Sequence, residues 1–299
     1  MKQRETARIH LLVAKEAPVA VIIRRKPSKR FHIIKWHLDS REFEHGSWFF
    51  GKLYPLRSDL SWDGEFMSYL ALGGKGQTWC GVCRAPWLTT ILESENHGTY
   101  DGGGIFWERN TYLANQRYPL PIELKPEWPQ NISVGLIRQR FNSEDLSIIF
   151  HRLHRDGWRL NVDGQFVTVL DDQSGIVPGM PSPCDHPLQW KFSKLHPTLQ
   201  VRYMGYRSTS VGDSAANAPI YAGRHGYLFH FELLDHPDLL GPQVDWATWT
   251  SQGDLIWAKY GVVYRQSLEG LANGNEPKAF DLNDLEPPSR PKPTTPFVV

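Results

Sequence analysis

Two cysteines at a short spacing have the plainest chemical potential in this chain. Cys80 and Cys83 stand in the string Trp-Cys-Gly-Val-Cys, and two thiols at this spacing are suited to a reversible disulfide. Such a redox pair needs the second cysteine in the first turn of a helix, but Pro86 and the β-branched residues 89–91 favour a strand. Side chains alternate between the two faces of a strand, so these thiols point apart and cannot readily be joined. The sequence predicts two packed structural cysteines.

The same cysteines are also candidates for half of a zinc site. Cys184 and His186 would complete a set of three thiolates and one imidazole, which zinc accepts. The Cys-x-His spacing is tighter than an ordinary second half-site, and a strand would separate Cys80 from Cys83. We predict no metal and no cofactor, but the sequence leaves zinc binding by these four residues open.

A run of basic residues is the candidate partner-binding site. It consists of Arg24, Arg25, Lys26, Lys29 and Arg30. Such a run is suited to bind phosphates or an acidic protein surface, and its structural alternative is a solvated hairpin tip. The net charge of the chain is +1, so no basic field of the kind typical of nucleic-acid-binding proteins covers the molecule. If the run has a function, we predict contact with an acidic partner protein.

Other familiar catalytic patterns are absent from the sequence. Neither HExxH nor GxSxG occurs, and the glycine-rich stretch 73–76 lacks the Gly-Lys-Ser/Thr order of a phosphate loop, so we predict a hairpin turn there. His97 and Asp101 flank a glycine-rich loop, which leaves room for a ligand to approach the backbone, although a sharp turn explains the same pattern. The scattered tryptophans favour core packing over a sugar-binding surface.

The composition indicates what kind of elements must position these residues. Among 299 residues there are 25 Gly, 22 Pro and 12 Trp, which argues against a helical bundle, and 40% hydrophobic residues argue against disorder. Three cysteines are too few for a disulfide scaffold and predict a reducing compartment. The apolar runs 9–14 and 19–23 are too short for a signal sequence or a membrane span, so we expect a soluble cytoplasmic protein.

Short runs rich in β-branched and aromatic residues, separated by Gly and Pro turns, predict antiparallel strands. The predicted strands are 9–14, 19–23, 31–38, 47–54, 66–72, 77–92, 188–192, 198–206 and 227–233, followed by a hairpin that turns at 259–261. Residues 118–131 predict an extended connection. A helix is expected after Ser143, because Leu146, Ile149, Phe150 and Leu153 recur at helical spacing.

One segment resembles the repeats of a known group of proteins. Asp59–Tyr69, with the string Ser-Trp-Asp-Gly before an apolar strand, resembles the signature of TolB-like and WD40-like β-propeller repeats, with Trp62 where proline is usual. Thr250–Trp257 is similar to a degenerate copy, and His154–Leu160 is a weaker echo. The resemblance implies a diverged β-propeller-like arrangement of short antiparallel strands with one short helix, like that of uncharacterised bacterial proteins.

These observations lead to one functional hypothesis and one alternative. We expect a single propeller-like domain over residues 1–280 and a proline-rich, disordered tail over 281–299. The expected role is a non-enzymatic interaction, sensor or scaffold module that binds a partner protein encoded in the same operon, without nucleic acid or membrane. The alternative is a hydrolase whose site is assembled from dispersed His and Asp residues at a channel mouth. Convergence of three or more titratable groups in one pocket would favour the hydrolase.

Overall fold

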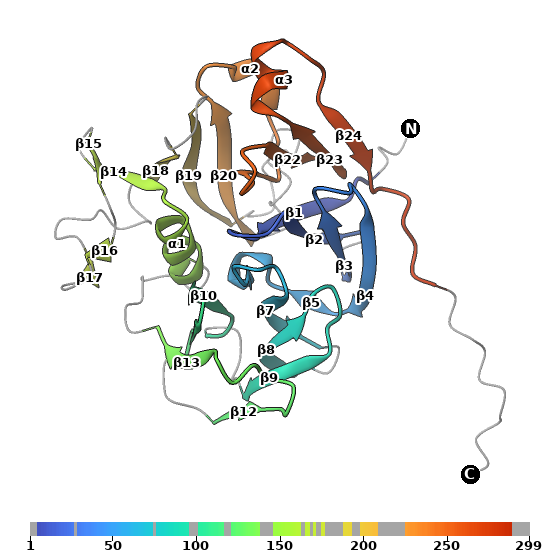
Figure 1. Ribbon diagram of the computed structural model, residues 1–299, viewed down its shortest axis with the longest axis vertical. Coiled ribbons are helices and arrows are strands. Elements are labelled where there is room, and N and C mark those ends of the chain that lie inside the picture. Colours follow the sequence, from blue (N-terminus) through green and yellow to red (C-terminus); the bar gives the residue numbers. More distant parts are fainter. Residues whose placement is uncertain are drawn as a thin grey trace.

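The computed structural model describes residues 5–26, 29–73, 76–95, 101–116, 121–137, 146–162, 198–208 and 225–288, together with the strand segments 165–167, 170–171, 175–176 and 188–192. This part of the chain is mainly β, with several antiparallel sheets and few, short helices (Figure 1). No helix in these ranges is long and apolar enough to cross a bilayer. The predicted mainly β character is confirmed.

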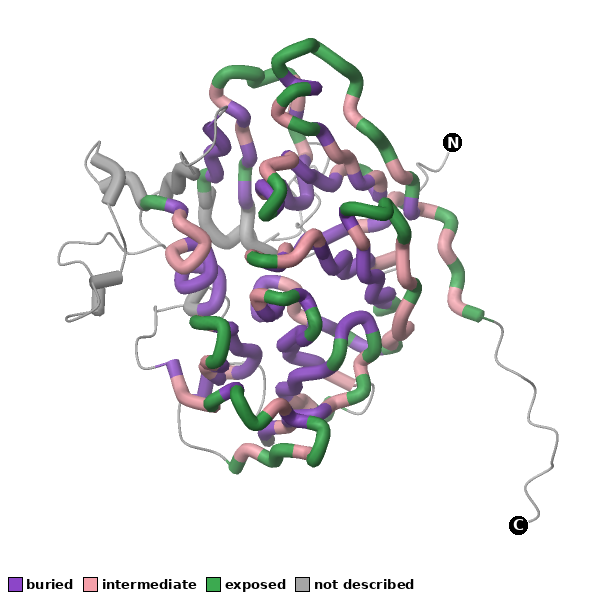
Figure 2. The backbone as a smooth tube through the Cα atoms, in the orientation of Figure 1, coloured by how far each residue is buried: buried purple, intermediate pink, exposed green. Residues whose placement is uncertain are grey.

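Sheet A is an antiparallel meander near the N-terminus. Its strands, in spatial and chain order, are β1 (Arg8–Val13), β2 (Val19–Arg25), β3 (Arg30–His37) and β4 (Phe43–Phe50). The first three strands are buried at nearly every position, as expected of strands covered on both faces. Leu11, Ile22 and Ile34 belong to the core shared with the C-terminal sheet, whereas Leu12 and Val21 belong to the core shared with sheet B. Figure 2 shows these strands as buried.

Sheet B follows directly in the chain. It contains β5 (Lys52–Leu53), β6 (Asp59–Leu60), β7 (Phe66–Leu72), β8 (Thr78–Arg84), β9 (Thr90–Glu95) and β12 (Ile122–Leu124), in the order β12-β9-β8-β7-β5, with β6 paired to β7. The run 77–92, expected as one strand, is divided into β8 and β9 by a turn at Pro86. Proline has no N–H to donate to a ladder, which explains why the strand stops there.

The remaining strands form four sheets. Sheet C has β10 (Gly104–Glu108), β11 (Thr111–Ala114) and β13 (Ser133–Leu136), and β11 and β13 are parallel. Sheet D has β14 (Arg159–Val162), β15 (Gln165–Val167), β18 (Leu188–Phe192), β19 (Leu199–Ser208) and β20 (His225–Leu233), and β16 (Leu170–Asp171) pairs with β17 (Gly175–Ile176). Sheet F has β21 (Trp246–Trp249), β22 (Leu255–Lys259), β23 (Val262–Gln266) and β24 (Lys278–Asp281). The strands predicted at 188–192, 198–206 and 227–233 and the hairpin at 259–261 are confirmed.

The predicted helix is present as α1 (Leu146–Arg155), although Ser143 lies outside the described residues. Its apolar residues Ile149, Phe150 and Leu153 are buried in the core that sheets A and F share. The helix packs against β10 and the single-turn helix η1 (Pro55–Arg57). The short helix α2 (Pro237–Leu240) precedes sheet F in the chain, and α3 (Leu268–Ala272) lies between its strands β23 and β24.

Two of the three segments that resemble propeller repeats have the same turn geometry. Gly64 N–H donates to the Ser61 carbonyl at 2.9 Å, and Gly253 N–H donates to the Thr250 carbonyl at 3.0 Å. Both glycines have a positive φ, of 77° and 83°, which glycine adopts without steric cost. The Ser61 hydroxyl also accepts the N–H of Phe66, the first residue of β7. The Thr250 hydroxyl likewise accepts the N–H of Asp254, the residue just before β22. His154–Leu160 differs, because it runs from the last turn of α1 into β14.

The chain beyond β24 returns to sheet A. Of the predicted tail 281–299, residues 281–288 are described and 289–299 lie outside the described residues. Leu282 is buried, and the Asn283 side chain accepts the Ala7 N–H at 2.8 Å and donates to the Tyr260 carbonyl at 2.9 Å. This segment therefore joins the N-terminal sheet to sheet F.

Candidate functional site

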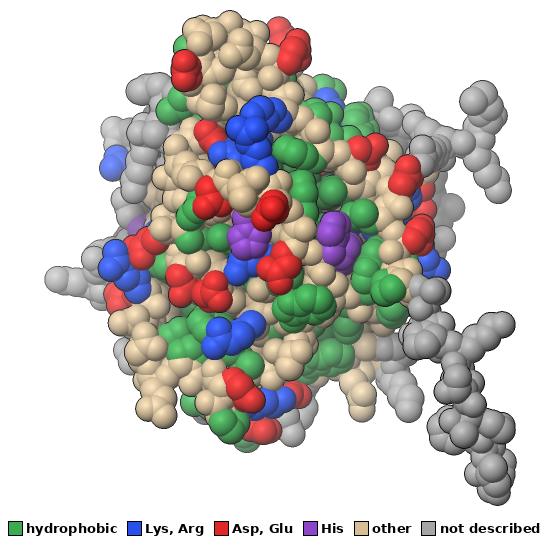
Figure 3. Space-filling model, turned by 45° about the vertical axis from the view of Figure 1, so that its right-hand side comes forward, with side chains coloured by type: hydrophobic (Ala, Val, Ile, Leu, Met, Phe, Trp, Pro, Cys, Tyr) green, Lys and Arg blue, Asp and Glu red, His purple; other side chains and the backbone are tan. Residues whose placement is uncertain are grey.

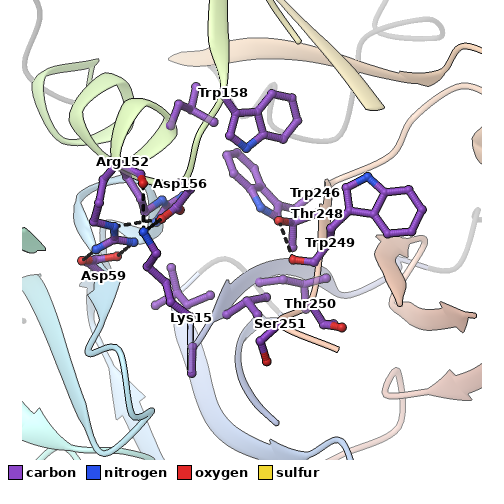
Figure 4. A pocket seen from close by; sticks show the side chains of 16 residues that line it. Lys15, Asp59, Arg152, Asp156, Trp158, Trp246, Thr248, Trp249, Thr250 and Ser251 are labelled. Carbon is purple, nitrogen blue, oxygen red and sulfur yellow. Dashed lines mark hydrogen bonds and ion pairs between the residues drawn. The ribbon is translucent and has the colours of Figure 1, made fainter. Parts of the chain in front are cut away.

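A pocket of about 210 Å³ lies where elements far apart in the sequence meet. It is lined by β1 and the residues after it, by β6, by the second half of α1 and by β21 with the turn that follows. In Figure 4, charged side chains lie on one side of the pocket, and indole rings and hydroxyl groups lie on the other. The labelled residues of the charged side are Lys15, Asp59, Arg152 and Asp156, and those of the opposite side are Trp246, Thr248, Trp249, Thr250 and Ser251.

Arg155 and Asp59 form a buried ion pair beside the pocket. Nη1 of Arg155 donates to Oδ2 of Asp59 at 2.5 Å and Nη2 donates to Oδ1 at 3.1 Å, with both side chains almost fully buried. Asp59 also accepts the Phe106 N–H at 2.8 Å, and Arg155 donates to the Phe106 carbonyl at 2.8 Å. Burial raises the pKa of Asp59, and Arg155 limits this rise. Because three N–H groups bind its oxygens, we assign the ionised carboxylate. The pair holds β6, β10 and α1 together.

Arg152 connects the helix to sheet A and to sheet F. Its Nη1 donates to the Ser58 carbonyl at 2.7 Å, its Nη2 lies 3.1 Å from Nε2 of His10, and its guanidinium lies 5.1 Å from the centre of the Trp246 ring. Burial, and then the charge of Arg152, lower the pKa of His10 well below its ordinary value. The imidazole is therefore neutral and accepts the arginine N–H through Nε2.

Lys15 caps the C-terminus of α1. Its ammonium donates to the Arg155 carbonyl at 2.9 Å, lies 3.8 Å from the Asp156 carboxylate and lies 4.3 Å from the centre of the Trp62 ring. The last carbonyls of a helix carry partial negative charge, so a cation is stabilised at this position. Lys15 thus fixes the end of α1 over the pocket.

Asp245 joins sheet F to sheet A in the way that Asp59 joins sheet B to sheet C. Its Oδ2 accepts the Ile9 N–H of β1 at 3.0 Å, just as Asp59 accepts the Phe106 N–H of β10. In both cases an aspartate in or just before a strand with only one neighbour in its sheet accepts a backbone N–H of the neighbouring sheet. Burial raises the pKa of Asp245 to about 7, although the hydrogen bond from the Ile9 N–H lowers it in part.

The predicted partner-binding run is divided between the interior and the surface. Arg24 is buried, and its Nε and Nη2 donate to the carbonyls of Leu282 and Asn283 at 2.5 and 2.7 Å. Lys26 donates to the same Asn283 carbonyl at 2.9 Å. Arg25 is half-buried against a phenylalanine ring, Lys29 and Arg30 are exposed, and Arg30 lies 3.6 Å from the Glu286 carboxylate. These contacts involve the chain itself, so partner binding by the run stays a prediction.

The two cysteines occupy β8 with their thiols on opposite sides, as predicted. Both are free and buried: Cys80 accepts the Gly103 N–H of the segment before β10, whereas Cys83 lies in the core shared with sheet A. Burial raises the pKa of Cys80 to about 11 and raises the pKa of Cys83 further. Cys184 and His186 lie outside the described residues, and no group of three metal-ligating side chains occurs in the ranges that are described.

The loop candidates have structural contacts where they are described. Gly73 N–H donates to the Gln77 carbonyl at 2.8 Å, which confirms a hairpin turn, although residues 74–75 lie outside the described ranges. The Asp101 carbonyl accepts a hydrogen bond from the buried Arg57 at 2.8 Å. His97 lies outside the described residues.

Sequence reasoning did not identify the residues of the pocket. The only local signal was the Asp59–Gly64 string, which marked a turn but gave no role to Asp59. In the sequence, Arg152 and Arg155 have the spacing of residues on the polar side of a helix, and nothing in the sequence places them beside β1 or β21. No protein-family model matches this chain, and no curated protein matches it in sequence.

Proposed function

We propose that the chain is a non-enzymatic, propeller-like binding module of the bacterial cytoplasm that holds a partner protein at the pocket between β1, β6, α1 and β21. The observation that carries the proposal is the pocket itself, which four elements separated along the chain build together. The matching turns before β7 and β22, and the matching roles of Asp59 in β6 and Asp245 just before β21, support a repeated unit. Aromatic walls beside polar groups are typical of recognition pockets.

One observation supports the alternative function, a hydrolase: several charged groups converge in this pocket. Lys15, Asp59 and Asp156 are titratable groups of one pocket, and a raised pKa, as at Asp59, is common in catalytic acids. Their contacts favour binding instead, because Asp59 and Lys15 bind backbone groups or charged side chains of neighbouring elements. A catalytic group must exchange a proton with substrate, which these contacts oppose.

Quantitative affinity capture from the native cell tests the proposal. Thr248, which is half-buried and lines the pocket, is changed to Phe so that an aromatic ring fills the space. The matched control is Thr111→Phe at a half-buried strand position outside the pocket. We expect one protein, encoded in the same operon, to be captured by the wild type and the control and lost with T248F. Equal capture by all three would overturn the role of the pocket.

The basic run makes a separate prediction about salt. Acidic and basic side chains are interspersed on the face shown in Figure 3, so a local cluster rather than the whole surface would attract an acidic partner. Replacing Arg25, Lys29 and Arg30 with Gln, and keeping the buried Arg24, should leave the fold intact. If the run contacts the partner, association measured by stopped flow should slow and lose its dependence on salt. If the association rate keeps the same dependence on salt, the basic run does not contact the partner, and its only role is in contacts within the chain.

A further inference from the structure

The outer edge of β12 has backbone groups without hydrogen bonds. β12 is the terminal strand of sheet B and pairs, among the described strands, only with β9. Lys125 N–H donates to the Ile91 carbonyl at 2.9 Å, so Glu123, two residues earlier, also bonds to β9. The N–H and C=O groups of Ile122 and Leu124 therefore point away from β9, and they have no hydrogen bond in the described part of the chain.

This edge of the sheet is accessible to another molecule. Glu123 is exposed, 49% of the surface of Leu124 is exposed, and Ile122 is half-buried. β12 lies at the lower edge of the molecule in Figure 1, and the same stretch is mostly exposed in Figure 2. An accessible strand edge of this kind is a template for pairing with another extended chain.

A mainly apolar groove of about 550 Å³ adjoins β12. It is lined by Leu124 and by Val134 of β13, which is the terminal strand of sheet C. Trp128 and Ile132 also line it, and Nε1 of Trp128 donates to the Ile132 carbonyl at 3.1 Å, which fixes this part of the wall. Ile122 and Leu124 lie on the same face of β12, so side chains of an added strand on that face would contact the groove.

The opposite face of β12 carries negative charge that is not balanced. Glu123 lies directly opposite Glu93 of β9, and like charges in this position repel. Neither carboxylate has a salt bridge within the described ranges, and Lys125, which lines the groove, pairs with neither. A basic side chain on an added strand would relieve the repulsion. A second copy of this chain would increase it, because pairing two β12 strands brings two further glutamates to the same edge.

We propose that β12 and this groove bind an extended segment of another protein in which apolar and basic residues alternate. The segment adds as a strand along β12, with its apolar side chains toward the groove and its Lys or Arg side chains beside Glu123. Successive residues of a strand rise by about 3.3 Å, so the edge from Ile122 to Lys125 is about 10 Å long and pairs with three or four residues. No residue lines both this groove and the pocket between β1, β6, α1 and β21, so the inference does not depend on the proposed function.

Selection from a phage-displayed library of octapeptides tests this inference. Every second position of the library is Val, Ile or Leu, and the positions between them are randomised. The library is screened against the whole chain as wild type, Glu123→Lys, Leu124→Ser and the control Glu276→Lys. Glu276 is also exposed, and its connection from α3 to β24 lies at the opposite end of the molecule from β12 (Figure 1). Calorimetry measures the affinities of the enriched peptides after synthesis.

Pairing beside Glu123 predicts a reversal of charge preference. Wild type and E276K should enrich Lys and Arg at the randomised positions, whereas E123K should enrich Asp and Glu. A variant that merely fails to fold would enrich neither set, so the reversal distinguishes recognition from loss of structure. L124S should bind the wild-type peptides at least tenfold more weakly, because it removes a wall of the groove.

Amide hydrogen exchange followed by NMR locates the contact. On addition of an enriched peptide, exchange at Ile122 and Leu124 should slow, whereas exchange at Glu123, which already bonds to β9, should change little. No enrichment by the wild type, the same enriched residues for E123K, or unchanged exchange at Ile122 and Leu124 would overturn the inference. None of these outcomes affects partner capture at the other pocket, which T248F tests separately.

Discussion

Asp245 is a carboxyl group whose protonation is linked to folding. Its pKa is about 7 in the folded chain because the group is buried, against an ordinary value of 3.8. Between these two values the folded state holds a proton that the unfolded state has released. The contribution of Asp245 to the free energy of unfolding is therefore full below pH 3.8 and is lost as the pH rises through 7.

Replacing Asp245 with Asn should remove this dependence on pH. The amide oxygen still accepts the Ile9 N–H, but the side chain no longer titrates. The difference in free energy of unfolding between wild type and D245N should shift against the wild type by about 4 kcal/mol from pH 4 to pH 7, at about 1.4 kcal/mol per pKa unit. Urea unfolding at a series of pH values measures it. A constant difference would show that folding does not raise the pKa of Asp245.

The two thiols make a second prediction at this scale. Cys83→Ser should lower the free energy of unfolding by about 1–3 kcal/mol, because a hydroxyl is placed in an apolar core. Cys80→Ser should cost less, since serine can accept the same Gly103 N–H. Both wild-type thiols should react slowly with iodoacetamide at pH 8 and remain unlinked after mild oxidation. A reversible Cys80–Cys83 disulfide found by mass spectrometry would contradict this.

At the scale of elements, the Arg155–Asp59 pair is what fixes α1 against β6 and β10. Asp59→Asn removes the buried one of the two carboxylates that pair with Arg155, leaving only the partly exposed Asp156, and should lower the free energy of unfolding by about 3–5 kcal/mol. The control Asp39→Asn, at an exposed turn, should change it by less than about 0.5 kcal/mol. Urea denaturation compares the two. Similar losses for both variants would mean that the pair does not hold the elements together.

The strands were largely predictable because their signals are local. β2 and β3 follow from β-branched runs between turn residues, and α1 follows from the spacing of Ile149, Phe150 and Leu153. The division of 77–92 at Pro86 was missed because the apolar pattern continues on both sides of it. Local patterns report on a residue's own element, and they identified the elements without showing how those elements meet.

The pocket could not be predicted, because it forms where elements distant in the sequence meet. Its ion pair joins positions 59 and 155, and its helix cap joins Lys15 to the carbonyl at 155. Arg24 illustrates the same difficulty: in a run of cations it reads as solvated, but it shares a strand face with the buried Ile22 and turns inward. Its charge is satisfied by carbonyls of residues 282 and 283, more than 250 positions away in the chain.

At the scale of the whole molecule, the segment after β24 should contribute to stability only through its first residues. Truncation after Glu286 removes the proline-rich residues 287–299 and should change the melting temperature by less than about 4 °C, which corresponds to roughly 1 kcal/mol. Truncation after Asp281 also removes Leu282 and Asn283 and leaves Arg24 buried without these carbonyls, so it should lower the melting temperature further. Calorimetry compares the two. A large effect of the shorter truncation would show that the tail docks.

The bonds between Asn283 and Ala7 and between Arg24 and residues 282–283 also decide how the molecule responds to mechanical force. A pull applied at residues 5 and 288 acts on these few contacts first, because they bridge the two points of attachment directly. These contacts would break sequentially, before the force acts on the hydrogen bonds between β1 and β2. In an optical trap the protein should therefore open at sheets A and F under low force, with sheet B still folded.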